Sequence, residues 1–251
     1  MIINNMEPII SVRGLEARYG EKRILSDISF DIFAGQVTVI LGPSGCGKTT
    51  LLKNMLRLHE PVKGSVKFWG EEVLQMDETS FNAVLRKVGM LFQGGALLNS
   101  ISVMENVAIP LEQHTRLSRS VIERIIRVKL DLVGLHHAIH LLPSELSGGM
   151  RKRAGLARAM VMDPPILFCD EPSAGLDPLT SASLDELLLD LKKQLNMSIV
   201  IVTHELASIY RVADRVIFLD EGALIYEGTL DGARQAGIPT IDRFFEAGKY
   251  E

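Results

Sequence analysis

The nine residues 42–50 are the part of the chain whose types and spacing are best suited to chemistry. They run glycine, four other residues, glycine, lysine and threonine, which fits the pattern G-x-x-x-x-G-K-[ST]. The glycines let the backbone curl around an anion with its N–H groups pointing inward. In such a loop the lysine reaches the β- and γ-phosphates and the threonine hydroxyl holds Mg²⁺. The expected phosphate-binding residues are Gly42, Pro43, Ser44, Gly45, Cys46, Gly47, Lys48, Thr49 and Thr50.

The segments on either side of this loop are those that a phosphate-binding loop requires. Residues 36–41 are an apolar, β-branched run typical of a buried strand, and residues 50–56 have the composition of a helix. The N-terminus of that helix adds the positive end of its dipole to the loop. A glycine-rich turn that binds nothing is the alternative, and the flanking segments make it the weaker interpretation.

The acidic pair Asp170 and Glu171 is a second candidate site. It follows the apolar run 166–169, which we expect to be a buried strand. An aspartate at the carboxyl end of such a strand, beside a phosphate-binding loop, holds Mg²⁺. Glu171 is then placed to polarise an attacking water. A strand end that merely exposes acids to solvent is disfavoured, because the apolar run leads directly into both acids.

Three single residues are candidates on other grounds. Gln93 ends an expected strand and precedes two glycines, so a hinge that contacts a metal or water and a simple turn residue are equally good interpretations. His204 follows the expected strand 198–203, at the edge where ligands of open α/β sheets bind. Tyr19 lies beside a glycine, and its spacing alone favours surface packing over stacking on a base.

The residues Ser147, Gly148 and Gly149 form a second anion site by the same physics as the first. They stand at the start of an expected helix, 151–162. One chain cannot easily place both sites on a single phosphate tail, so the second is expected to serve a nucleotide held by another copy. The basic run 151–153 lies in the first turn of that helix, where cations oppose the dipole. A solvated face is the alternative interpretation of this run.

The remaining segments predict the elements that position these groups. Residues 9–12 and 28–32 are β-rich runs around a turn, typical of an antiparallel edge sheet. Residues 216–219 and 223–226 flank an Asp-Glu-Gly turn, which predicts a hairpin. The block 103–141 includes the apolar spacing of an amphipathic helix and is expected to be a helical insertion in an α/β core.

The C-terminal tail, residues 229–251, is expected to be helical and polar. It carries an exposed-looking pair of aromatic residues, Phe244 and Phe245. Two adjacent aromatics near a terminus dock either on a partner or on the domain itself. Together with Tyr250, the pair raises the hypothesis that the tail grips a second subunit.

The composition is that of an ordinary globular chain. Of 251 residues, 47% are hydrophobic and 23% are charged, and the net charge of −4 gives no general attraction to nucleic acid. Cys46 and Cys169 lie far apart in apparent nucleotide-site segments, which suggests a reducing compartment. No apolar run approaches the ~18 residues of a membrane span, and residues 1–8 lack the features of a signal peptide. We therefore expect a cytosolic protein whose membrane-spanning partners are other chains.

Taken in order, these motifs resemble the ATP-binding subunit of ABC transporters over essentially the full chain. The resemblance matches Tyr19 to the A-loop aromatic, which favours stacking on the base, Gln93 to the Q-loop and His204 to the H-loop. The other matching stretches are Walker A at 42–50, the LSGGQ-like stretch at 146–150, Walker B at 166–170 with Glu171, and the D-loop at 173–177.

The resemblance implies an α/β fold. Its expected parts are a P-loop NTPase core of mainly parallel sheet, an antiparallel β subdomain and an α-helical subdomain. A single ABC ATPase domain is implied over residues 1–251. The implied parts are the nucleotide-binding core at 9–93 and 160–226, the helical subdomain at 94–159 and the C-terminal tail at 227–251.

The resemblance also implies an ATP hydrolase with ATP and Mg²⁺ as cofactors, and roles for named residues. The implied catalytic residues are Glu171, His204, Lys48 and Gln93; the implied metal ligands are Thr49, Gln93 and Asp170. Tyr19 is implied to contact the base. The loop 42–50 is implied to hold the phosphates, with Ser147, Gly148 and Gly149 of a second copy completing the site in a head-to-tail dimer.

Two stretches are similar to a narrower group, the ATPases of Mce-type lipid transporters, including the Mla system of Gram-negative envelopes. They are residues 91–107 and 146–153. Met150 stands where the wider family has Gln and is then a subfamily mark; backbone N–H groups and the Ser147 hydroxyl still supply the phosphate contacts, but a polar contact from position 150 is lost. The implied function is to power phospholipid transport between inner and outer membranes from the cytoplasmic face of the inner membrane. The implied partners are a second copy, membrane permeases, a periplasmic Mce-type lipid-binding protein and often a STAS-domain protein.

Two other functions remain as alternatives. One is the ATPase of another ABC transporter, for amino acids or lipoproteins, because the permease and binding protein choose the substrate. The other is a non-transport ABC ATPase acting in translation or DNA repair. It is disfavoured because the chain has one Walker A motif, a short helical insertion and no basic face for nucleic acid.

Overall fold

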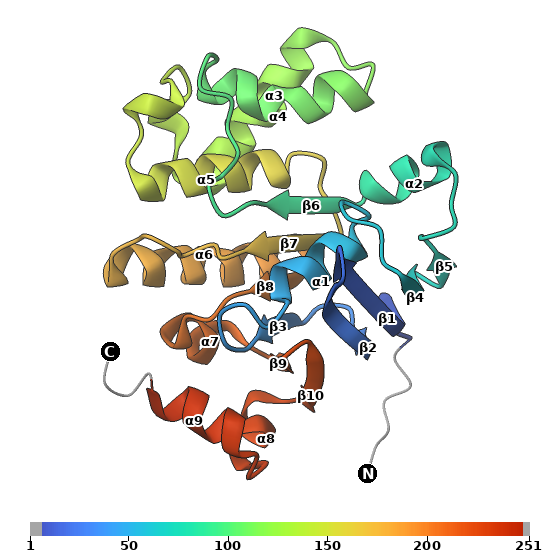
Figure 1. Ribbon diagram of the computed structural model, residues 1–251. Helices are drawn as coiled ribbons and strands as arrows, with labels where there is room; N and C mark the ends of the chain where they lie inside the picture. Colours follow the sequence, from blue (N-terminus) through green and yellow to red (C-terminus); the bar gives the residue numbers. More distant parts are fainter. Residues whose placement is uncertain (1–6, 248–251) are drawn as a thin grey trace. The chain divides into compact units, whose positions relative to one another are not determined.

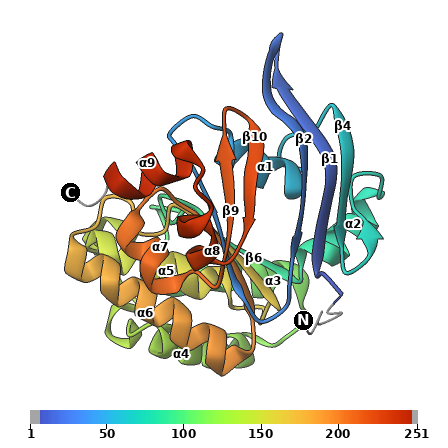
Figure 2. The same cartoon turned by 90° about the horizontal axis from the view of Figure 1, so that it is seen from below.

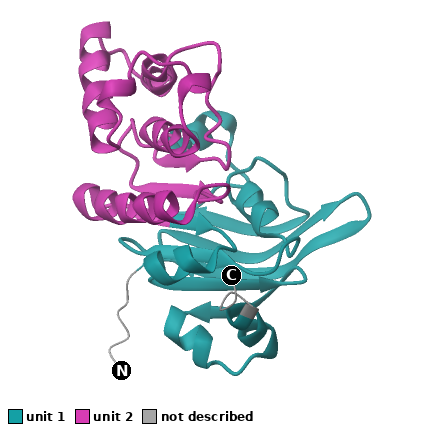
Figure 3. Ribbon diagram, turned by 90° about the vertical axis from the view of Figure 1, so that its left-hand side faces the viewer, with its two compact units in different colours: residues 1–85, 200–251 teal, residues 86–199 magenta. Residues whose placement is uncertain are grey.

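The computed structural model describes residues 7–247, which fold into two compact units (Figures 1 and 3). Unit 1 combines residues 1–85 with residues 200–251, and unit 2 is residues 86–199. The hypotheses about Tyr250 and about the first six residues lie outside the described range. The subdivision expected from the motifs, into a nucleotide-binding core, a helical subdomain and a tail, is defined by function. Units 1 and 2 are defined by contacts within the chain, so the boundaries of the expected parts stay a prediction.

Unit 1 contains a four-stranded antiparallel sheet with the order β2-β1-β4-β5. Its strands are β1 (Ile10–Tyr19), β2 (Lys22–Ile32), β4 (Lys63–Phe68) and β5 (Glu71–Glu72). Pairing between β1 and β2 runs from Ile10 opposite Ile32 to Tyr19 opposite Lys22. The predicted antiparallel sheet is confirmed, but the two strands continue up to the turn and form a long ribbon (Figure 2).

The phosphate-loop strand of unit 1 belongs to a group of strands with the order β10-β9-β3. Strand β3 (Val37–Leu41) is fully buried and runs parallel to β9 (Arg215–Asp220), which pairs with β10 (Ala223–Gly228) as the predicted antiparallel hairpin. Helix α1 (Lys48–Met55) follows β3 through the glycine loop. Strand, loop and helix therefore succeed one another as the sequence predicts.

The other helices of unit 1 are α2 (Glu78–Leu85), α7 (Leu206–Val212), α8 (Leu230–Gln235) and α9 (Pro239–Ala247). The expectation that Phe244 and Phe245 are exposed is wrong. The ring of Phe244 lies 5.1 Å from that of Phe218, and the ring of Phe245 lies 5.8 Å from that of Tyr210. Phe245 is only 6% exposed. The pair docks on its own domain, because α9 turns its apolar face inward against β9 and α7.

Unit 2 is mainly helical, with two parallel strands, β6 (Val88–Leu91) and β7 (Ile166–Asp170). Its helices are α3 (Val103–His114), α4 (Arg119–Leu132), α5 (Gly148–Ala159) and α6 (Pro178–Leu195), with short 3₁₀ turns at η1 (His136–Ala138) and η2 (Pro143–Glu145). Strand β8 (Ser198–Val202) crosses the boundary between the units. Helix α3 begins with a capping box, since the Ser102 side chain accepts from the Glu105 N–H while the Glu105 carboxylate accepts from the Ser102 N–H.

These elements confirm the predicted fold class: an α/β chain with parallel pairing in the core, an antiparallel β part and a helical part. One predicted boundary is wrong, because α5 begins at Gly148 and not at Arg151; the Ser147 side chain caps it by accepting from the Met150 N–H. Within residues 7–247, no helix is long and apolar enough to cross a membrane.

Candidate functional site

The glycine loop of unit 1 has a backbone that only glycine accommodates at two positions. Gly42 has φ +145°, and a Cβ there would lie 2.0 Å from the Leu219 carbonyl oxygen. Gly47 has φ +109°, and a Cβ there would lie 2.7 Å from a methyl carbon of Leu25. The loop is therefore folded tightly against β9 and β2, and its glycines are required by contact as well as by backbone angle. Such a curled loop leads the first N–H groups of α1 toward one point.

Lys48 lies inside the curl of this loop. It is 7% exposed, and its Nζ donates to the carbonyl oxygens of Gly42 at 2.8 Å and Pro43 at 3.0 Å. Burying an ammonium group is costly unless its donors are satisfied, and here the loop's own carbonyls satisfy them. The side chain is thus held over the loop by the backbone of the loop itself.

The other loop residues divide into exposed and buried members. Ser44, Gly45 and Thr49 are exposed, so their polar groups are open to a ligand. Cys46 is buried, and burial raises the pKa of its thiol even though the nearby Lys48 opposes the change. Thr50 is also buried, at 9% exposure, which favours a role of its side chain in packing.

His204 lies at the same end of the unit 1 strands as the glycine loop. The preceding residue, Thr203, donates its backbone N–H to the carbonyl oxygen of Ile40, two residues before Gly42. The hydroxyl of Thr203 accepts from the Glu205 N–H at 3.1 Å, which shapes the turn that presents His204. His204 itself is exposed. The strand end that carries His204 therefore lies beside the end of β3, which leads into the glycine loop.

Tyr19 is linked to helix α1 through two residues that the sequence analysis missed. Its ring is 47% exposed and meets the His59 ring edge-on, with centroids 4.6 Å apart. His59 is in turn held by the fully buried Asn54 of α1, whose Nδ2 lies 3.0 Å from His59 Nδ1 and donates to the His59 carbonyl at 3.2 Å. No local pattern marks this chain of contacts, because Tyr19 is distant in sequence from both partners.

In unit 2, the acidic pair stands at the end of β7 as predicted. Residues 166–169 are fully buried and Asp170 is partly exposed. Glu171 has φ +46°, a left-handed conformation that costs a residue other than glycine about 1–3 kcal/mol. Its carbonyl oxygen accepts from the Ala174 N–H at 3.2 Å and from Lys152 Nζ at 3.2 Å. The backbone is thus held in a strained turn that directs the chain out of the strand.

The predicted second anion site is the N-terminus of α5. Ser147 and Gly148 are exposed, and Gly149 packs so closely that a Cβ would lie 2.6 Å from a methyl carbon of Thr180. Thr180 is fixed in the first turn of α6, where the Asp177 carboxylate accepts from its N–H. A hydrogen bond from the Thr180 hydroxyl, together with the one from its N–H, lowers the pKa of Asp177.

Gln93 follows β6, and its side chain is exposed. Its carbonyl oxygen accepts from Lys152 Nζ. Lys152 belongs to the basic run 151–153, for which a solvated face is the alternative interpretation. That interpretation is wrong for Lys152, which is 6% exposed. A hollow of about 520 Å³ lies between the segment after Gln93, the first turn of α5 and residues 174–176. Sequence reasoning missed the role of Lys152 because helical spacing does not show which neighbour a long side chain reaches.

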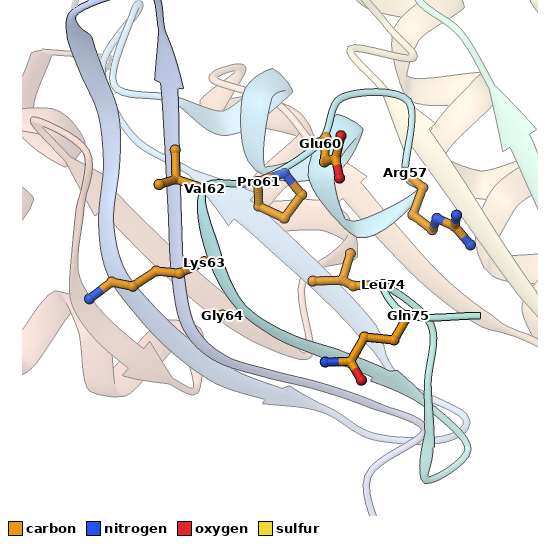
Figure 4. A pocket seen from close by; sticks show the side chains of 8 residues that line it. All are labelled: Arg57, Glu60, Pro61, Val62, Lys63, Gly64, Leu74 and Gln75. Atoms are coloured by element: carbon orange, nitrogen blue, oxygen red, sulfur yellow. The ribbon is translucent and has the colours of Figure 1, made fainter. Parts of the chain in front are cut away.

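A separate pocket of about 440 Å³ lies in unit 1 beside the end of α1 (Figure 4). Two cations line it: Arg57 and Lys63. Arg57 donates to the carbonyl oxygens of Val73 and Met76 and lies 4.3 Å from the centre of the Phe81 ring, and Lys63 pairs with Glu16. None of the residues that line it is a predicted site residue. Arg57 and Lys63 thus have structural partners.

Comparisons with known proteins agree with this arrangement. Residues 25–174 match the family model described as ABC transporter. The chain is 40% identical over 235 residues to the probable ribonucleotide transport ATP-binding protein mkl of Mycobacterium leprae, covering 94% of this chain and 68% of that protein. It is 37% identical over 238 residues to the intermembrane phospholipid transport system ATP-binding protein MlaF of Haemophilus influenzae, covering 95% of this chain and 90% of that protein.

Among solved structures, the fold is similar to the ATP-binding cassette MJ0796, seen as a dimer in a post-hydrolysis state bound to ADP and Pi. The TM-score is 0.80 at 28% identity, over 88% of this chain and 98% of that chain. The motifs in their order, the geometry of the glycine loop and these similarities lead to one assignment. The chain belongs to the ABC transporter family and is an ATP-binding, ATP-hydrolysing subunit of that family.

Proposed function

We propose that two copies of this chain sandwich ATP head to tail and that its hydrolysis powers phospholipid transport of the Mla or Mce type. The observation that carries the proposal is the pairing of two anion sites in one chain: the curled loop around Lys48 and the capped N-terminus of α5 at Ser147. Each site supplies donors to one side of a phosphate tail. A second copy is needed to bring the other side.

The phosphate loop binds the tail of ATP in this proposal. Lys48 exchanges its bonds to the loop carbonyls for the β- and γ-phosphates, and the N–H groups of the loop surround them. Gly42 supports this role, because any Cβ there would collide with the Leu219 carbonyl and open the loop. Tyr19 offers its half-exposed ring to the adenine, supported from behind by His59.

The residues present also fit Mg²⁺, which prefers oxygen ligands and is usually held with substrate phosphates. The proposed ligands are the exposed Thr49 hydroxyl, the Asp170 carboxylate and the Gln93 amide oxygen, all oxygen donors. When bound, the ion would neutralise charge on the phosphates. This ligand set follows from the chemistry of the donors.

Hydrolysis requires a group to orient water and a group to hold the γ-phosphate. Glu171 is proposed to take the proton of the attacking water, from its position directly after the end of β7. His204 is proposed to hold the γ-phosphate and water in register, and Lys48 to offset charge that develops on the transferred group. Gln93 is proposed to link the metal site to the helical part, against which a permease would press.

The dimer is proposed to close on itself. Ser147, Gly148 and Gly149 of each copy face the nucleotide in the other copy, so the interface is isologous. The dimeric state of the similar cassette bound to ADP and Pi supports this arrangement. ATP stabilises the closed dimer by contacts that the open state lacks, and hydrolysis removes them.

The phospholipid cargo rests on the similarity to MlaF, which spans 90% of that protein's length. The mycobacterial relative is named for ribonucleotide transport, but the match covers 68% of its length. The proposed partners are permease subunits, a Mce-type lipid-binding protein and a STAS-domain protein, with the chain on the cytoplasmic face of the inner membrane. An amino acid or lipoprotein transporter is the competing assignment.

Two measurements test the proposal. If two copies form the catalyst, ATPase activity per chain rises with chain concentration when the protein is assayed alone, and activity strictly proportional to concentration contradicts the dimer. Co-purification from detergent-solubilised membranes, with identification of the associated chains and lipids, tests the cargo. A permease recovered with phospholipid supports the Mla assignment, and recovery with ribosomes would overturn the transport role.

A further inference from the structure

Lys152 is a buried cation that the proposed reaction does not use. It lies in the second turn of α5 and is 6% exposed. An ammonium group has three N–H donors and no acceptor, and its burial is costly unless those donors find oxygen atoms. Arg151, the neighbouring cation on the same helix, is exposed. The two adjacent cations therefore have different surroundings.

Two of the oxygens that Lys152 contacts belong to the two segments proposed to carry the reaction in unit 2. Its Nζ donates to the carbonyl oxygen of Gln93 and, at 3.2 Å, to the carbonyl oxygen of Glu171. These residues are distant in sequence, and each contributes a proposed catalytic side chain. A single side chain thus holds both backbones at the points where those side chains depart.

Helix α5 provides a rigid base for this contact. A Cβ on Gly155 would lie 3.0 Å from the Gly95 Cα, so the helix packs closely on the segment after Gln93. Arg158 of the same helix donates to the carbonyl oxygens of Ala96 at 2.8 Å and Gly95 at 3.0 Å. The glutamine segment, residues 93–96, is therefore bound to α5 at several points, whereas Lys152 joins Glu171 to α5.

We infer that Lys152 is a positioning residue for ATP hydrolysis, which couples the backbone at Gln93 to the backbone at Glu171. The inference rests on the proposed function. Because Glu171 occupies a left-handed backbone conformation, its carboxylate direction depends on the contacts that hold its peptide groups. A shift of the glutamine segment moves the ammonium group, and with it the carbonyl of the proposed base. Lys152 itself touches neither ATP nor water in this role.

The test compares Lys152→Met with Lys129→Met in steady-state ATPase assays of the full chain. Lys129 is a matched control, because it is also a buried lysine of unit 2, 5% exposed, but pairs with Asp163. Lys152→Met should lower kcat by about 10- to 100-fold, the effect of a small misplacement of a catalytic group, with KM for ATP little changed. Lys129→Met should lower the melting temperature but leave kcat near the parental value. Lys152→Arg, which keeps a cation with several donors, should recover most of kcat.

A parental kcat in Lys152→Met overturns the inference, as does an equal loss of kcat in Lys152→Met and Lys129→Met. If Lys152→Met fails to fold, Lys152→Gln and Lys152→Arg replace it. A higher kcat for arginine than for glutamine supports the inference, and equal values overturn it. Glu171→Gln is assayed in parallel: if it is inactive while Lys152→Met is fully active, only the inference fails. If Glu171→Gln hydrolyses ATP at the parental rate, the proposed function of Glu171 fails as well.

Discussion

The two regions proposed to carry the reaction are built in different ways. In unit 1, the glycine loop holds Lys48 with carbonyl oxygens from residues five and six positions earlier in the chain. In unit 2, the backbone of Glu171 is held by Lys152, and the same lysine contacts Gln93, 59 positions away. Lys48 is thus held by hydrogen bonds within its own loop, whereas the Glu171 backbone is held by a longer-range contact to α5.

This difference assigns different tasks to the two regions. A loop whose shape is set by its own glycines is pre-organised, and pre-organisation favours binding because little ordering remains to be done. A carboxylate held through a helix that also holds the glutamine segment responds to movement of that segment. We therefore expect the glycine loop to act mainly on ATP affinity, and the Gln93 and Glu171 segments of unit 2 to act mainly on the rate of hydrolysis.

The largest expected effect is that of Glu171→Gln. Loss of the proposed general base should lower kcat by about 10²- to 10⁴-fold, while ATP affinity and ATP-dependent dimerisation persist, because the glycine loop is unchanged. Turnover, ATP binding by calorimetry and the sedimentation of the chain with ATP measure the three properties. Glu186→Gln, at an exposed position of α6, is the control and should keep parental activity. Parental turnover in Glu171→Gln would contradict the role of Glu171 as the general base.

Lys48→Ala should lower ATP affinity, the property that Glu171→Gln leaves unchanged. The variant loses the charged donor to the phosphates, and truncating one partner of a buried charge pair lowers affinity by about 30-fold or more. Calorimetric titration with ATP measures the loss. Lys53→Ala changes an exposed lysine of the same helix and should bind ATP as the parent does. Full affinity in Lys48→Ala would contradict the assignment of binding to the glycine loop.

Features that depend on residues close together in the chain were predictable from the sequence. The order of strand, glycine loop and helix depends on backbone angles and on residues a few positions apart. The spacing of Gly42, Gly47 and Lys48 is therefore enough to predict it. The apolar run that ends at Asp170 similarly predicts strand β7. Both regions are recognisable because their patterns lie within about ten consecutive residues.

Features that depend on long-range packing were not predictable. Lys152 stands in a basic run that resembles a solvated face, and its burial depends on carbonyl groups contributed by β6 and β7 segments. The Phe244 and Phe245 pair looked exposed because a polar tail surrounds it, but α9 turns it onto Phe218 and Tyr210. In both cases the deciding partner lies far away in the sequence.

Variants of Tyr19 test whether the proposed adenine-binding end of the site acts on ATP affinity, as we expect of the glycine loop. Tyr19→Ala should raise KM for ATP by about 5- to 100-fold, the range for loss of one base–aromatic stack, with little change in kcat. Tyr19→Phe keeps the ring and should bind as the parent does. His59→Ala should have a smaller effect in the same direction, because His59 supports the Tyr19 ring edge-on. A fall in kcat without a change in KM would assign Tyr19 to the chemistry and contradict its proposed role in binding the adenine.

The smallest effect separates helix capping from contact with a second copy. Ser147 and Ser102 cap α5 and α3 in the same way, each accepting the N–H of the residue three positions later. Replacing either by alanine should lower the free energy of unfolding by about 1 kcal/mol. In a Glu171→Gln background, where ATP-bound dimers accumulate, only Ser147→Ala should also weaken ATP-dependent dimerisation, measured by analytical ultracentrifugation. Equal dimerisation of the two variants would mean that Ser147 acts only as a cap, and that the N-terminus of α5 binds phosphate through its backbone N–H groups alone.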